Sequence, residues 1–237
     1  MLAKTLPYAA LLISLPVAAV PTPVGPATAL GGDGLNSTWV DLTYSPHTVD
    51  EALAALALPD SDPAVNAIYH QVVPYIDWSD GGSGTGADAT TTRTDLPVGN
   101  DDSFAVTFYG YLNITTAGTY NFQVYSDDGF RLNLGGETVA EYYYDRGPGS
   151  SYATLQLAAG LYALELMSWE QGGVYVDELT WDTLGNGVYV TVPQNVLFTT
   201  AVPEPETWAM LLAGLGIIGL KLRQGRFRAA RNNLTER

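Results

Sequence analysis

The chain has 237 residues, 46% of them hydrophobic, which is enough for one large domain and excludes general disorder. It contains no cysteine, so disulfide bonds, thiolate metal sites and cysteine nucleophiles are excluded. Between Leu30 and Val202, 22 acidic residues face three arginines, a formal charge of −19, so we expect no nucleic-acid partner. Such a surface suits divalent cations or neutral glycans.

The first 29 residues are typical of a secretory signal peptide. Lys4 precedes an apolar run from Leu6 to Val20, which is too short and too rich in proline for a membrane anchor. Two cleavage candidates with small residues follow, one ending at Ala19 and the other at Ala29. We therefore predict an exported protein whose folded domain begins at about residue 30.

Short alternating segments dominate residues 30–193. In residues 103–114 every second residue is apolar or glycine, which predicts a half-buried strand. Further strands are expected over residues 34–42, 67–78, 119–134, 137–144, 151–157, 162–166 and 174–181. A capping box formed by Thr48 and Glu51 predicts one short helix that ends near Ala57. The pattern as a whole predicts an all-β fold, an antiparallel β-sandwich with one small helix.

The last of these strands contains a change of parity. Val174 and Val176 have one parity, whereas Leu179 and Trp181 have the other. We expect a β-bulge at residues 177–178 to bring all four side chains to one face.

An acidic corner interrupts the alternation of residues 119–134. Apolar residues alternate with polar ones as far as Val124, and the alternation resumes at Leu132, after Ser126-Asp127-Asp128-Gly129. Adjacent carboxylates repel each other, and a hard cation such as calcium would remove that conflict. The alternative is a structural turn in which the aspartates cap backbone amides.

The corner resembles a β-sandwich family named after the N-terminal domain of anthrax protective antigen. The family string G-x-Y-x-F-x-x-x-S-D-D-G-x-R-L stands at residues 118–132. The family includes the sugar-binding heads of yeast flocculation adhesins, so the resemblance implies a cis peptide between Asp127 and Asp128 and a calcium ion that binds sugar hydroxyls. Glu170 stands where the adhesins have an asparagine ligand. The implied metal ligands are therefore Asp127, Asp128 and Glu170, with Glu170 as a departure from the family.

Three residues near this corner are candidate carbohydrate-binding residues, namely Trp169, Gln171 and Tyr143. The two aromatic rings can stack on a sugar, although aromatic residues at sandwich edges also serve ordinary packing. Neither of the two histidines, His47 and His70, neighbours a plausible nucleophile, and no hydrolase motif is present. We therefore expect no enzyme.

The C-terminal segment resembles the PEP-CTERM sorting signal of Gram-negative bacteria. The motif Val202-Pro203-Glu204-Pro205 is followed by Trp208, an apolar stretch that ends at Leu220, and a basic cluster that includes Arg223 and Arg226. About 13 helical residues span only ~20 Å, short of the ~30 Å hydrocarbon core, which suits a transient anchor. We assign residues 194–201 to a spacer, 202–228 to the sorting signal and 229–237 to a basic tail.

This second resemblance concerns destination rather than activity. It implies processing by an exosortase, a membrane protease, after transient association with the inner membrane, and a link to exopolysaccharide. The same motif is also known as an ice-binding-protein C-terminal segment, but the chain has no threonine-ladder repeat. Two hypotheses remain: a calcium-dependent module that binds polysaccharide at the cell surface or in the extracellular matrix, and a structural surface protein with no specific ligand.

Overall fold

The computed structural model describes residues 20–79, 93–98 and 102–201. In chain order its elements are β1 (Leu35–Leu42), α1 (Val49–Leu56), β2 (Val65–Val73), β3 (Asp77–Ser79), β4 (Phe104–Ile114), β5 (Gly118–Asp127), β6 (Phe130–Leu134), β7 (Glu137–Tyr142), β8 (Gly149–Leu157), β9 (Gly160–Glu170), β10 (Val176–Asp182), β11 (Val190–Thr191), η1 (Gln194–Val196) and β12 (Leu197–Phe198). The helix and most strands lie where the sequence predicts them.

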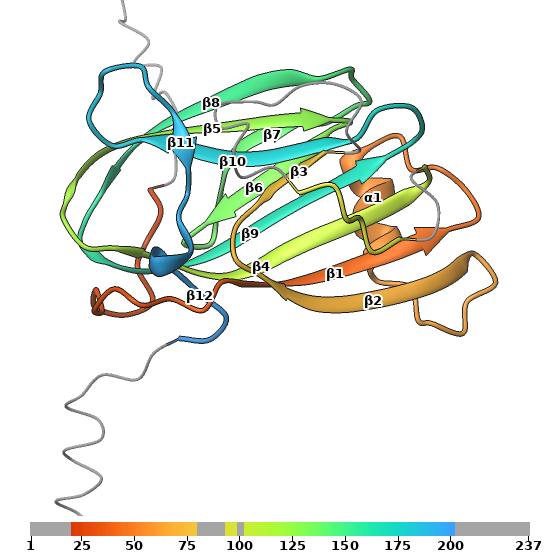
Figure 1. Ribbon diagram of the computed structural model, residues 1–237, viewed down its shortest axis with the longest axis horizontal. Helices are drawn as coiled ribbons and strands as arrows, with labels where there is room; N and C mark the ends of the chain where they lie inside the picture. The colour runs from red at the N-terminus through yellow and green to blue at the C-terminus, as the bar shows by residue number, and fades with distance from the viewer. Residues whose placement is uncertain (1–19, 80–92, 99–101, 202–237) are drawn as a thin grey trace, which may run out of the picture.

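Two antiparallel sheets form the layers of a sandwich (Figure 1). The seven-stranded sheet has the order β2-β1-β4-β9-β6-β7, with β12 paired to β4. The five-stranded sheet has the order β11-β10-β5-β8, with β3 paired to β10. The predicted antiparallel β-sandwich is therefore confirmed.

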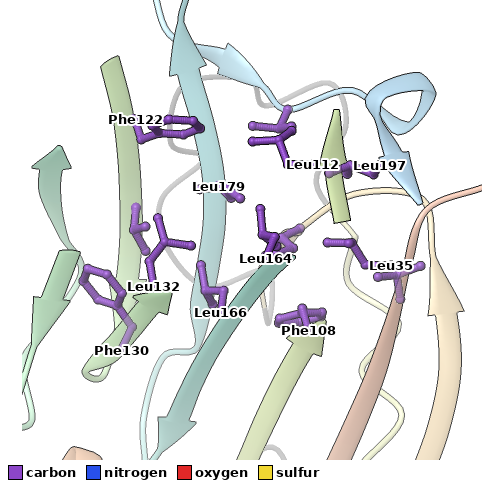
Figure 2. Packing of buried hydrophobic residues seen from close by; sticks show 14 of the residues in the cluster. Leu35, Phe108, Leu112, Phe122, Phe130, Leu132, Leu164, Leu166, Leu179 and Leu197 are labelled. Carbon is purple, nitrogen blue, oxygen red and sulfur yellow. The ribbon is translucent and has the colours of Figure 1, made fainter. Parts of the chain in front are cut away.

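The core lies between the layers, where the apolar face of each strand meets that of the opposite sheet. On β4, Phe104 and Phe108 are completely buried, as the alternation of residues 103–114 predicts. Trp39 of β1 lies among aromatic rings, with its centroid 5.1 to 6.1 Å from those of Trp78, Phe104, Phe108 and Tyr175. Figure 2 shows how leucine and phenylalanine side chains from both sheets fill the space between them.

Helix α1 covers the outer face of the seven-stranded sheet at one end. It begins at the predicted capping box, where the Glu51 amide donates to the Thr48 hydroxyl and the Glu51 carboxylate accepts from the His47 amide. Its buried residues pack against Val40, Met167 and Trp169, whose side chains would otherwise face solvent. At this end the sheet is therefore buried on both faces.

The β-bulge predicted at residues 177–178 is not present. Strand β10 pairs with β5 without a shift of register, from Val176 opposite Asp127 to Asp182 opposite Asn121. Asp177 shares the inward parity of Leu179, is fully buried, and accepts a hydrogen bond of 2.8 Å from the Ser168 hydroxyl. The apparent change of parity arises because an acidic residue occupies an inward position.

Residues 20–34 form a strap across one end of the sandwich, where β4 ends and β9 begins. The Val24 amide donates to the Leu161 carbonyl at 2.7 Å, and the Leu161 amide donates to Gly25 at 2.8 Å. The side-chain amide of Asn113, which is 1% exposed, exchanges two hydrogen bonds of 3.0 and 2.7 Å with the backbone of Thr28. The packed domain therefore begins about ten residues earlier than expected.

The segment that we expected to be a spacer, residues 194–201, also packs on the fold. Leu197 is completely buried and pairs with Leu112 of β4, and the two lie close together in Figure 2. Asp33 of the strap accepts hydrogen bonds from the amide and hydroxyl of Thr199, at 2.8 and 2.7 Å. The strap and the end of the domain thus hold each other in place.

Removal of the strap is expected to destabilise the domain. A chain that starts at Leu30 loses the hydrogen bonds of Val24 and Gly25 with Leu161 and the two of Thr28 with Asn113, and each such bond contributes about 0.5–1.5 kcal/mol. We expect a chain starting at Leu30 to be about 2–6 kcal/mol less stable than one starting at Val20. Urea unfolding of the two versions tests this, and equal midpoints would contradict it.

Most of the predicted signal peptide (residues 1–19), the sorting signal and the basic tail (202–237) lie outside the described residues. Among the residues that are described, no helix is long and apolar enough to cross a membrane.

Candidate metal centre

The acidic corner is the point where the chain crosses from one sheet to the other. Strand β5 of the five-stranded sheet ends at Asp127, and β6 of the seven-stranded sheet begins at Phe130. The peptide bond between Asp127 and Asp128 is cis, as the resemblance implied. Gly129 is required by space, because a Cβ atom there would lie 2.2 Å from the Trp169 ring and 2.5 Å from the Tyr142 carbonyl oxygen.

Glu170, the last residue of β9, completes a cluster of three carboxylates at this corner. Carboxylate oxygens of Asp127, Asp128 and Glu170 lie within 4.8 Å of one another. The three residues are 7%, 3% and 0% exposed. The structure therefore brings together all three predicted metal ligands, from strands far apart in the sequence.

Backbone amides hold two of these carboxylates. Asp128 accepts from the amide of Arg146 at 3.1 Å with Oδ1 and from the amide of Gln171 at 2.8 Å with Oδ2. Glu170 accepts from the Gly172 amide at 2.7 Å with Oε1. Its other oxygen, Oε2, is buried and has no hydrogen-bond partner in the part of the chain that the structure describes.

Burial makes the carboxyl groups of Asp128 and Glu170 hard to ionise. Burial and repulsion from Asp128 raise the pKa of Glu170 to about 9. Burial also raises the pKa of Asp128 to about 6, although the Gln171 and Arg146 amides partly offset the effect. Carboxylate oxygens are the ligands of hard cations, and a cation would offset both the burial and the mutual repulsion. The donor set, including the unpaired oxygen of Glu170, fits a calcium ion.

The three candidate sugar-binding residues are placed differently. Trp169 is completely buried beneath α1, and its Nε1 donates to Asp145 at 3.1 Å, so its ring offers no face to a ligand. Tyr143 is half-buried, and its hydroxyl donates to Asp50 at 2.8 Å. Gln171 is half-buried and lines the cavity beside Asp127 and Asp128.

The loop after β7 supplies residues that the sequence did not single out. Asp145 accepts from Trp169 and forms an ion pair with His47 at 2.6 Å. The Arg146 guanidinium lies over the Tyr142 ring at 4.5 Å and donates to the hydroxyls of Ser126 and Ser151 at 2.8 and 3.0 Å. Together with the carboxylate pair and Gln171, this loop lines a cavity of about 280 Å³. Only the three-dimensional fold brings it to the corner.

The predicted sorting residues, from Val202 to Arg226, lie outside the described residues. A family model of the PEP-CTERM protein-sorting motif nevertheless matches residues 201–226. A second model, that of the PA14 domain, the protective-antigen family, matches residues 83–183. No curated protein sequence matches the chain.

Several solved structures share the fold. The PA14 domain of the MpAFP antifreeze protein is 21% identical, with a TM-score of 0.56 over 80% of this chain and 100% of that chain. The PA14 sugar-binding domain of an RTX adhesin is 22% identical, with a TM-score of 0.53 over 71% and 99%. The epithelial adhesin 9 A domain of Candida glabrata, solved in complex with Galβ1-3GlcNAc, is 14% identical, with a TM-score of 0.52 over 78% and 99%. Identities this low establish the fold alone.

Proposed function

From the premise that the chain carries a PA14 domain followed by a PEP-CTERM sorting motif, we propose that it is an exported surface or matrix protein that binds glycans through a calcium ion at its acidic corner. Asp127, Asp128 and Glu170 would hold the ion, which when bound would supply positive charge toward sugar hydroxyls. The observation that carries this proposal is the buried Oε2 of Glu170, which has no hydrogen-bond partner among the described residues and lies beside two other buried carboxylates. A purely structural turn gives no reason to bury three carboxylates within 4.8 Å.

The surroundings of the corner favour an uncharged sugar. Asp145 and Gln171 border the cavity and offer hydrogen-bond acceptors and an amide, the groups that suit hydroxyl ligands. Arg146 is tied to two serines and stacked on Tyr142, so its guanidinium serves to hold the loop in place. The large negative charge of the domain disfavours anionic polymers. The same fold in the sugar-binding PA14 domain of an RTX adhesin, and in an epithelial adhesin domain solved with Galβ1-3GlcNAc, supports the same ligand class.

A glycan array tests the proposal. The protein is applied once with calcium and once with chelator, together with Asp127→Asn/Asp128→Asn. We expect binding to at least one neutral glycan that chelation and the double variant both reduce more than tenfold, because the loss of the ion removes a charge-assisted contact of about 1.5–3 kcal/mol.

The matched control is Asp60→Asn, which removes one carboxylate from an exposed turn and should bind as the wild type does. If the wild type binds no glycan in calcium, or if the double variant retains its calcium-dependent binding, the structural hypothesis becomes the better one.

The tail should act as a processing signal. Because its apolar stretch of about 13 residues is a poor permanent anchor, we propose transient inner-membrane association followed by cleavage by an exosortase-type protease. In a host that has an exosortase, the mature protein is expected to lack the residues after about Pro205. Intact-mass measurement of surface or matrix protein checks this. Recovery solely of species that retain Arg223 and Arg226 would refute the prediction.

A further inference from the structure

A second cavity, of about 440 Å³, lies at the end of the sandwich opposite the acidic corner. It opens beside the turn between β4 and β5, whereas the corner lies where β5 ends (Figure 1). Ten residues of β5 separate the two, which is roughly 30 Å at ~3.4 Å per residue. Its lining includes Asn113, Thr115, Thr116, Tyr120, Trp181 and Thr183.

None of the described residues that line this cavity is charged, although the chain is very acidic. None of its lining residues is ionisable at neutral pH, and residues 103–126 and 147–164 contain no charged side chain. Asp182 lies between two lining residues in the sequence but is itself only 3% exposed. Its carboxylate accepts hydrogen bonds from the amides of Leu184, Gly185 and Gly187. The described lining therefore offers no carboxylate to a metal ion and no charge to an ionic ligand.

An aromatic side and a hydroxyl rim line the cavity. The half-buried ring of Trp181 lies 5.7 Å from the ring of Tyr120, measured between centroids. The rim residues Thr115, Thr116 and Thr183 are exposed, so their hydroxyls are accessible to a ligand. Aromatic faces pack against the C–H face of a sugar ring, while hydroxyl and amide groups hydrogen-bond with its hydroxyls. This combination suits a neutral saccharide.

The walls of the cavity are held by the fold before any ligand arrives. Tyr120 donates from its hydroxyl to the Thr116 carbonyl at 2.8 Å, which fixes the turn. Asn113 uses its amide to hold Thr28, so the strap closes one side. Such preorganisation lowers the entropic cost of binding.

We propose that this cavity is a second saccharide-binding site that works without a metal ion. The site itself does not depend on the proposed function of the corner. If both sites bind, one molecule carries two binding ends and connects two glycan chains.

The test uses the full chain on an array of uncharged oligosaccharides in the presence of EGTA, which removes the calcium that the proposed site at the acidic corner needs. We expect residual binding, retained by Asp127→Asn/Asp128→Asn and reduced about tenfold or more by Thr116→Glu/Thr183→Glu, which puts charge on the exposed rim. The matched control is Thr94→Glu/Thr154→Glu, which places the same charges on exposed threonines outside the cavity.

The outcomes separate this proposal from that for the corner. The second site is overturned if the wild type binds no oligosaccharide in EGTA. It is also overturned if Thr116→Glu/Thr183→Glu binds in EGTA as well as the wild type does. If calcium-dependent binding is lost in Asp127→Asn/Asp128→Asn, the proposal for the corner stands, whatever the result for the second site. Circular dichroism of each variant checks that the fold is retained, and beads coated with a bound oligosaccharide should aggregate when both sites are active.

Discussion

Calcium at a hundredfold excess over its Kd is expected to stabilise the folded protein by about 2.7 kcal/mol, because an ion that binds only the folded state adds RT ln(1 + [L]/Kd). For a domain of this size, each kcal/mol corresponds to roughly 2–4 °C, so the melting temperature should rise by roughly 5 to 10 °C. The proposed ligands are Asp127, Asp128 and Glu170, and burial raises the pKa of both Asp128 and Glu170, so that the corner resists ionisation without a cation. Differential scanning calorimetry with and without calcium measures the effect.

Screening of the −19 charge would also raise the melting temperature, so two controls are needed. Magnesium and sodium at matched ionic strength report the diffuse effect, since magnesium demands a smaller and more regular coordination shell. Asp127→Asn/Asp128→Asn should lose the specific response. An equal calcium response in the wild type and in this double variant would rule out the site.

Glu170→Gln is expected to stabilise the calcium-free protein at pH 8 by several kcal/mol. The folded-state pKa of Glu170, about 9, lies above its ordinary value of 4.5. Because the folded state binds the Glu170 proton more tightly than the unfolded state does, protonation of Glu170 contributes fully to the free energy of unfolding below about pH 4.5. This contribution is lost as the pH rises toward 9, by up to about 1.4 kcal/mol per pH unit. Glutamine keeps an acceptor for the Gly172 amide and carries no charge to bury.

Urea unfolding of both proteins between pH 4 and pH 9 measures this difference. The free energies of unfolding of the two proteins should be equal near pH 4 and diverge as the pH rises. In calcium at pH 8 their difference should become smaller, because the variant lacks one of the proposed ligands. Glu137→Gln, at the partly exposed start of β7, is the matched control and should follow the wild type. A Glu170→Gln variant that is less stable than the wild type at pH 8 without calcium would show that the pKa of Glu170 is not raised.

The alternation of side chains along each segment was sufficient to predict the sandwich. Residues 103–114 read as a half-buried strand and form β4, and the capping box at Thr48 and Glu51 starts α1. The acidic corner was also recognisable from Asp127 and Asp128, because two adjacent aspartates before a glycine are unusual between two strands. These features depend on neighbours in the sequence, and so the sequence by itself determined them.

Only the tertiary structure decided what surrounds that corner. Strand alternation does not say which sheet a strand joins, so it could not show that β5 and β6 lie in different sheets or that Arg146 packs beside them. It also assigns one buried face per strand, whereas α1 buries the outer face of β9 and removes Trp169 from the surface. The strap and the segment from Gln194 to Phe198 are ordered by contacts with distant strands. Burial on a second face and the pairing of distant segments are long-range effects, and they decide which predicted side chains a ligand can reach.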